Sequence, residues 1–337
     1  MSKNKWYEQV ENQGDLAVST RIRLARNLKD YPFSSKLTAD KLNCINRAVW
    51  DAVPDKKDFD YIELCDLNKA QRLALCEQHL ISPEFADKND GHAVIMNKDR
   101  SVCIMLCEED HIRIQVLCAG FALEKAYKTA DAIETELEKK LIFAFDKDLG
   151  YLTECPTNLG TGMRASVMLH LPALEAANGI EALSRAVGKI GLTLRGTYGE
   201  GSGAAGSLYQ LSNQITLGID EKSAIENLSA VTKQVMEKEL EARKTVGRDN
   251  LEDMVYRSLG ILKSARMLSG AELSKHLSNL RLGGSMNMED IPSPALINQL
   301  ENELCAAAIT AQNPDCKTPE ARDKFRAARV REMLKLH

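Results

Sequence analysis

Apolar residues along this chain follow two patterns, one typical of strands and one typical of helices. Short runs rich in valine and isoleucine predict strands at Val94–Cys107, His111–Cys118 and Leu192–Tyr198. Apolar positions spaced three and four apart predict helices over 120–147, 172–187 and 223–246. Strands and helices are therefore mixed in the first two thirds of the chain.

Beyond Gly247 the glycine-bearing strand patterns stop, and only helical patterns remain. Ser269 and Glu272 have the spacing of a capping box, which marks the start of one helix. We expect a first domain over 1–246 and a second, all-helical domain over 247–337. The helices of the second domain are predicted near 250–268, 269–281, 292–310 and 318–336.

The composition narrows the classes of function. The chain has 337 residues, of which 44% are apolar and 27% charged, as in a soluble globular protein. A net charge of −4 gives no broad basic field, so nucleic acid is not the default partner. No apolar run approaches the roughly 20 residues of a membrane span, and Met1–Asn12 lacks the apolar core of a signal peptide. Nine cysteines without a Cys-x-x-Cys pair favour reduced thiols in the cytoplasm.

One loop combines residues that suit an anion site. The sequence Cys155-Pro156-Thr157-Asn158-Leu159-Gly160-Thr161-Gly162-Met163-Arg164 places two glycines just before an arginine. Glycine allows close backbone approach, and the guanidinium fork of arginine fits phosphate oxygens. No Gly-Lys-Ser/Thr follows, which excludes a Walker A loop. A purely structural turn is the alternative interpretation.

Three further stretches carry candidate chemistry. In the strand predicted near Leu16–Asn27, Arg21 and Arg23 point to one face, where an anion would relieve their repulsion. A solvated basic edge is the alternative.

The adjacent acids Glu108-Glu109-Asp110 repel one another unless a cation is nearby, although solvent exposure would also explain them. The formal Gly-x-Gly-x-x-Gly within Gly199–Gly206 leads into a strand, so we interpret it as a hairpin loop and not a dinucleotide fingerprint.

These motifs together resemble the phosphagen (guanidino) kinases, the family of creatine and arginine kinases. The string Cys-Pro-Thr-Asn-Leu-Gly-Thr-Gly followed by Arg164 is similar to the family signature. The Ser-x-Arg-x-Arg, Glu-Glu-Asp-His-x-Arg and Arg-Gly-x-x-Gly-Glu motifs also have counterparts here, in the family order, over about residues 15–220. Cys107 stands where the family usually has Asn. The resemblance implies an α+β fold, an antiparallel sheet flanked by helices, followed here by an all-α C-terminal domain.

The resemblance also implies roles for single residues. Glu109 and Glu200 would hold and deprotonate the substrate guanidinium, and Cys155 would assist as a polarising thiolate. ATP and Mg²⁺ would be the cofactors, with no metal site built from protein residues alone. The residues expected to bind ATP are Ser19, Thr20, Arg21, Ile22, Arg23, His79, Arg113, Arg164, Ala165, Ser166, Val167, Met168, Arg195, Gly196, Thr197, Tyr198, Gly199 and Glu200.

The organisation of the chain is similar to that of the bacterial protein-arginine kinases. Small-molecule members carry a helical domain of about a hundred residues before the first arginine strand, whereas only a short lead-in is expected here. The hexapeptide from Arg322 to Ala327, with Asp323 and Arg326, resembles the motif by which those kinases bind phosphoarginine allosterically. A charged helix tail is the alternative for that hexapeptide.

We therefore predict a cytoplasmic kinase that transfers the γ-phosphoryl group of ATP to arginine side chains of proteins. The resemblance further implies a homodimer, a zinc-binding activator, and delivery of marked proteins to a Clp chaperone-protease in stress response and protein quality control. Neither a membrane nor nucleic acid is an expected partner. A kinase of free arginine or another small guanidino compound, and a phosphoarginine-binding adaptor without activity, are the two alternatives.

Overall fold

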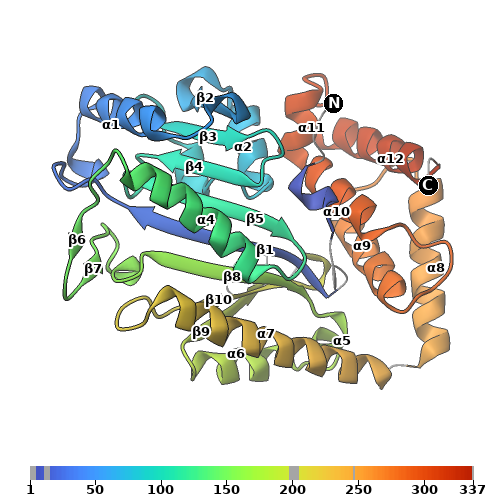
Figure 1. Cartoon of the computed structure of the whole chain (residues 1–337). Helices are drawn as coiled ribbons and strands as arrows, with labels where there is room; N and C mark the ends of the chain where they lie inside the picture. Colours follow the sequence, from blue (N-terminus) through green and yellow to red (C-terminus); the bar gives the residue numbers. More distant parts are fainter. Residues whose placement is uncertain (1–4, 11–15, 197–204, 246, 336–337) are drawn as a thin grey trace.

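The computed structural model describes residues 5–10, 16–196, 205–245 and 247–335. Its centre is an eight-stranded sheet in the order β2-β3-β4-β5-β1-β8-β10-β9, in which every neighbouring pair is antiparallel (Figure 1). The strands of this sheet are β1 (Ala17–Arg26), β2 (Phe59–Glu63), β3 (Ala93–Asn97), β4 (Val102–Leu106), β5 (Ile112–Ala119), β8 (Met163–His170), β9 (Leu192–Gly196) and β10 (Leu208–Asn213). A separate hairpin consists of β6 (Phe145–Asp146) and β7 (Gly150–Tyr151).

One face of the sheet is covered from end to end by helices. The helices on this face are α1 (Ala39–Ala52), α4 (Leu123–Glu138), α6 (Ile180–Gly188) and α7 (Glu221–Lys244). Alternate strand residues such as Ile22, Leu24 and Val167 point into this layer and are fully buried. Because strand side chains alternate between the two faces, the intervening residues must lie on the other side.

The second face is covered only in part. The short helix η1 (Trp6–Glu8) packs there with α2 (Lys69–Glu77) and α3 (Pro83–Ala86), over β3, β4 and β5. Their apolar cluster ends at Leu117 on β5. Beyond β5, the residues on this face include Arg21 of β1, Ser166 and Met168 of β8, and Gln210 of β10, which line one cavity.

The C-terminal part is wholly helical, as its sequence pattern predicts. Its helices have their own apolar cluster, built around side chains such as Leu277, Leu300 and Val330. The capping box of Ser269 and Glu272 is present. The helices are α8 (Arg248–Ser264), α9 (Gly270–Ser285), α10 (Pro294–Glu303), α11 (Ala306–Gln312) and α12 (Pro319–Lys335).

Hydrogen bonds join the two parts of the chain at separate places. The Tyr7 carbonyl accepts from Asn298 Nδ2 at 3.1 Å. Glu77, at the end of α2, accepts from the backbone nitrogen of Ala307 at 2.7 Å, at the start of α11. His170, at the end of β8, lies 2.8 Å from the Ser278 hydroxyl in a buried hydrogen bond. The sheet and the C-terminal helices are thus fastened to each other along one side (Figure 1).

Most element types are as predicted, but several boundaries differ. The strand predicted over Val94–Cys107 is two antiparallel strands, β3 and β4. The helix predicted over 120–147 ends at Glu138, before the β6–β7 hairpin. The helix predicted over 172–187 is two helices, α5 (Pro172–Ala176) and α6, because Asn178 adopts a left-handed conformation with φ of 55°. The helix predicted over 292–310 likewise divides into α10 and α11.

Candidate active site

The pairing of strand β1 sets the arrangement of the candidate site. Arg23 lies directly opposite Arg164 on β8 and opposite Gln115 on β5. Arg21 lies opposite Ser166 and is hydrogen-bonded through Nη2 to the side chain of Gln210 at 2.6 Å. The expectation that Arg21 and Arg23 share a face agrees with this register, and β8 adds a third arginine to the same face.

The arginine side chains lie close enough to repel one another. Burial first, and then the charges of Arg113 and Arg164, lower the pKa of Arg21 to about 10. Burial and the charges of Arg21, Arg113 and Arg164 lower the pKa of Arg23 well below its usual value. The Nε of Arg23 is buried, and no described residue accepts a hydrogen bond from it. Such a donor set fits an anion with several oxygen atoms.

Arg164 and Arg195 extend the cluster toward the outer strands. Burial, followed by the charges of Arg195 and Arg113, lowers the pKa of Arg164, while the sulfur of Cys155 opposes that shift. Arg195 is exposed on β9, where it lies opposite Gln210. Five arginines from four strands therefore surround one region of the open face.

Arg113 forms an ion pair with a carboxylate. Its Nη1 lies 2.7 Å from Glu108, whose side chain is only 8% exposed. The Ser82 hydroxyl donates to the same carboxylate at 2.5 Å. Burial alone would raise the pKa of Glu108, but Arg113 and the bond from Ser82 outweigh it and lower the pKa. The sequence analysis assigned no role to Ser82 or Glu108.

Glu109 follows the carboxylate of this ion pair in the sequence and is exposed. Burial first, then the charges of Asp110 and Glu108, raise the pKa of Glu109. Its carboxylate remains exposed, whereas Asp110 is buried and accepts from Asn27 at 2.6 Å and from the Glu154 backbone at 2.8 Å. Asp110 therefore holds the turn, and Glu109 is left accessible at its tip.

The signature loop runs along the edge of the same site. Cys155 precedes the short helix η5 (Pro156–Asn158), and its sulfur lies 3.0 Å from the Thr157 hydroxyl. Gly160 and Gly162 have φ of 106° and 58°, and a Cβ on Gly160 would overlap the Thr216 carbonyl. The two glycines thus allow close packing on neighbouring backbone. The sequence-based idea that they make room for a ligand is not what this geometry indicates.

A small cavity of about 30 Å³ lies next to Arg21. His79 lines it from the end of α2, with Ser19 and Met168 from the strands. His79 is exposed as a residue, but burial of its ring and the charge of Arg21 lower its pKa to about 4, which favours a neutral ring at pH 7. The cavity is lined by Trp6, Ser19, Arg21, His79, Leu117, Ser166, Met168 and Gln210.

Several predicted ATP-binding residues lie elsewhere. The side chains of Thr20, Ile22, Ala165 and Val167 are buried on the opposite face of the sheet, because strand residues alternate. They contact the core beneath α4 and α7 and do not line the arginine face. Gly196 ends β9, and the predicted residues Thr197, Tyr198, Gly199 and Glu200 lie outside the described residues.

The predicted phosphoarginine motif lies on α12, and its residues differ in exposure. Arg326 is 2% exposed and donates to the Leu304 carbonyl at 2.9 Å, the Leu268 carbonyl at 2.7 Å and Asp323 at 2.6 Å. Ala327 is also buried. Arg322 is more accessible and donates to a backbone carbonyl at 2.8 Å. Arg326 therefore tightens the helical packing in this structure.

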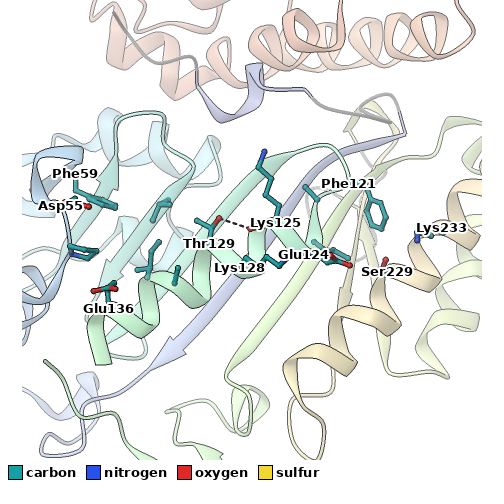
Figure 2. Close-up of a pocket in the computed structure, with 16 residues that line it drawn as sticks. Asp55, Phe59, Phe121, Glu124, Lys125, Lys128, Thr129, Glu136, Ser229 and Lys233 are labelled. Atoms are coloured by element: carbon teal, nitrogen blue, oxygen red, sulfur yellow. Dashed lines mark hydrogen bonds between the residues drawn. The ribbon is translucent and has the colours of Figure 1, made fainter. Parts of the chain in front are cut away.

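A second hollow, larger than the cavity beside Arg21, lies away from the arginine cluster. A groove of about 1140 Å³ runs along α4 on the helix-covered side of the sheet. Figure 2 shows Lys125, Lys128 and Phe121 along this groove, and no arginine of the cluster lines it. No group of three or more His, Cys, Asp or Glu side chains among the described residues could hold a metal ion. The hydrogen-bond donors of the arginine cluster fit an anion with several oxygen atoms, such as a polyphosphate.

Two protein families match this chain by sequence. The ATP:guanido phosphotransferase C-terminal catalytic domain matches residues 42–242. The fold is similar to a duplicated taurocyamine kinase from Schistosoma mansoni with bound transition-state-analogue components, at a TM-score of 0.61 and 26% identity. That match covers 80% of this chain and 41% of the kinase, which is the longer protein. Lombricine kinase, at 23% identity and a TM-score of 0.61, shares the fold over 74% of this chain and 72% of its own. The chain is a member of the ATP:guanido phosphotransferases.

Relatives of higher sequence identity show which family of these enzymes the chain belongs to. The Protein-arginine kinase McsB C-terminal domain matches residues 248–337. The protein-arginine kinase of Brevibacillus brevis is 40% identical over 99% of this chain and 97% of the relative. The protein-arginine kinase of Moorella thermoacetica is 42% identical over 98% of this chain and 97% of the relative. The chain belongs to the protein-arginine kinase family. Across the described segments, no helix has the length and apolar composition that a membrane crossing needs.

Proposed function

We propose that this kinase transfers the γ-phosphoryl group of ATP to arginine side chains of proteins. The observation that carries the proposal is the cluster of Arg21, Arg23, Arg113, Arg164 and Arg195 beside an accessible carboxylate, Glu109. Phosphoryl transfer depends mainly on positioning and on charge stabilisation, and arginines supply both. The proposal extends the activity named for the relatives to this chain.

In the proposed reaction, a guanidinium nitrogen attacks the γ-phosphorus of ATP. A nitrogen–phosphorus bond forms as the bond from the γ-phosphorus to the bridging oxygen breaks, which releases ADP. Guanidinium is protonated at pH 7, so the attacking nitrogen must lose a proton. Glu109 accepts that proton, and its raised pKa suits a general base.

Other residues orient the two substrates. Glu200 would form the second side of the carboxylate fork, and Cys155 would lie beside the guanidinium. The arginine cluster would hold the phosphates, with His79 toward the base of the nucleotide. Mg²⁺, when bound to the phosphates, supplies additional neutralisation of the transferring charge. No covalent enzyme intermediate is required, because transfer is direct and in line.

The test is phosphoarginine formation on a protein. Wild type is incubated with ATP, Mg²⁺ and an arginine-rich protein, and in parallel with free arginine, and phosphoarginine is measured by mass spectrometry. We expect phosphorylated protein, and a loss of at least about 10²-fold in rate for Glu109→Gln, since general bases contribute about 10²- to 10⁴-fold. Phosphorylation of free arginine alone would support the small-molecule kinase. ADP formation with neither acceptor modified would contradict both.

We also propose a second phosphoarginine site at Arg322, Asp323, Arg326 and Ala327, in a C-terminal domain that spans 247–337. It would couple product binding to catalysis, with an expected coupling of about 1–3 kcal/mol. In this proposal, Asp323 pairs with the incoming guanidinium, and Arg326 exchanges its contacts with Asp323 and with the Leu268 and Leu304 carbonyls for the phosphate. The initial rate is measured against free phosphoarginine, and the response should disappear in the Asp323→Ala variant. An equal response in wild type and variant would contradict the proposal.

The remaining partners are proposals drawn from the family resemblance. We propose a homodimer, stimulation by a zinc-binding activator protein, and recognition of the marked proteins by a Clp chaperone-protease, as part of a stress response. A cytoplasmic location is supported by nine free cysteines, which are typical of a reducing compartment. Sedimentation would test the dimer. Co-purification from cells with and without the Glu109→Gln change would test whether Clp association depends on phosphoarginine.

A further inference from the structure

Exposed apolar side chains gather at one end of the sheet. Six of the twelve large apolar side chains that are exposed among the described residues belong to three neighbouring loops. They are 43% to 68% exposed. We call this set the apolar rim, and it consists of Ile142, Phe145, Leu149, Ile190, Ile215 and Leu217.

The loops of the apolar rim hold the signature loop between them. On one side, the Tyr151 backbone nitrogen in β7 donates to the Gly160 carbonyl at 2.8 Å. On the other side, the Thr216 hydroxyl lies 3.0 Å from the Thr157 carbonyl and 2.7 Å from the Leu159 carbonyl. Thr216 lies between two residues of the rim. The loop that begins at Cys155 is therefore bordered by apolar side chains on both flanks.

The apolar rim lies next to the proposed acceptor site and far from the C-terminal helices. Figure 1 shows β6 and β7 at the end of the sheet opposite α8 and α9. Next to the rim, Glu154 lies near enough to raise the pKa of Glu109, after the larger effects of burial and of the neighbouring acids. An arginine that reaches Glu109 across the signature loop would thus pass over apolar side chains and arrive among carboxylates.

We propose that the apolar rim binds the polypeptide on either side of the acceptor arginine, and that it prefers segments with apolar side chains next to that arginine. Contiguous exposed apolar surface next to an active site is typical of a binding surface for a protein. The carboxylates of the proposed acceptor site complement the positive charge of the acceptor arginine. The apolar rim complements apolar side chains next to that arginine in the bound polypeptide. This inference rests on the proposed function, because it concerns the same acceptor.

The test compares two peptides, each with a single arginine. One has glycine and serine around the arginine, and the other has leucine and phenylalanine. Wild type should have the higher kcat/KM for the apolar peptide. The double variant Phe145→Ser with Leu217→Ser should lose about tenfold in kcat/KM on the apolar peptide, since a few interface side chains carry most of the binding energy. The same variant should act on the glycine–serine peptide as wild type does.

Matched controls separate the alternatives. The double variant Leu240→Ser with Ile261→Ser removes apolar side chains of similar exposure, 43% each, from α7 and α8 and should leave both peptides unaffected. Phe145→Leu keeps apolar area and should keep the preference. Equal losses on both peptides would mean that the rim only supports the signature loop, and they would overturn the inference. A change of oligomeric state in the rim variant would overturn it in favour of an interface between copies. A wild type that modifies neither peptide nor any protein would instead contradict the proposed function itself.

Discussion

Replacing Arg23 by methionine is expected to stabilise the free protein while weakening its binding of ATP. Arg23 is half-buried and lies opposite Arg164 in the sheet. Its Nε is buried, and no described residue accepts a hydrogen bond from it. An unsatisfied buried donor costs about 1–3 kcal/mol. Methionine fills similar volume with no charge and no donor, so it removes both this cost and the repulsion.

The expected sizes follow from these contacts. A gain of about 1–2 kcal/mol in the free energy of unfolding corresponds to about 1–3 °C in Tm, because 337 residues that unfold together give a shift of about 1.4 °C per kcal/mol. The lost charged hydrogen bond to phosphate should cost about 1.5–3 kcal/mol of binding. That is roughly a 10- to 100-fold increase in the Kd for ATP.

Thermal unfolding without nucleotide and calorimetric titration with ATP and Mg²⁺ measure the two effects. Arg26→Met is the matched control on the same strand. Arg26 is 1% exposed and pairs with Glu134 through both Nε and Nη2, so its loss should destabilise by about 3–5 kcal/mol. A lower Tm for Arg23→Met, or an unchanged Kd, would refute the reasoning.

Three further changes test other parts of the site. Gly160→Ala should destabilise the protein by about 2 kcal/mol or more in chemical denaturation, because its φ of 106° and the nearby Thr216 carbonyl leave no room for a Cβ. Cys155→Ser should slow phosphoarginine formation without abolishing it, and a phosphorylated cysteine trapped in wild type would contradict direct transfer. Glu108→Gln removes a charge that raises the pKa of Glu109, so the acid limb of the kcat/KM profile should move to lower pH. An acid limb at an unchanged or higher pH would argue against Glu109 as the general base.

Much of the fold was predictable because its elements have strong local patterns. The strand at His111–Cys118 and the helical C-terminal part were predicted from their residues, and the antiparallel sheet was implied by the family resemblance. The run Val94–Cys107 was predicted as one strand and is two. Boundaries were less predictable where a single backbone conformation decides them. Asn178, with positive φ, divides one predicted helix, and no periodicity in the sequence marks that division.

The residue types of the candidate site could be predicted from the sequence, but the ion pairs between its residues could be predicted less well. Alternation along β1 predicts that Arg21 and Arg23 share a face. The same alternation, applied to Thr20 and Ile22, would have placed their side chains in the core. The ion pair of Glu108 with Arg113 was missed, because residues five apart meet only when the turn before β5 folds them together.

The hydrogen bonds between the sheet and the C-terminal helices have a consequence for unfolding. They start from Tyr7, Glu77 and His170, which lie far apart in the sequence, and each ends on a different C-terminal helix. Loss of the C-terminal packing would strip partners from the N-terminal segment, from α2 and from the end of β8 together. The two parts should therefore melt in one cooperative transition, and the proposed ATP site should lose its order at the temperature where the C-terminal helices do.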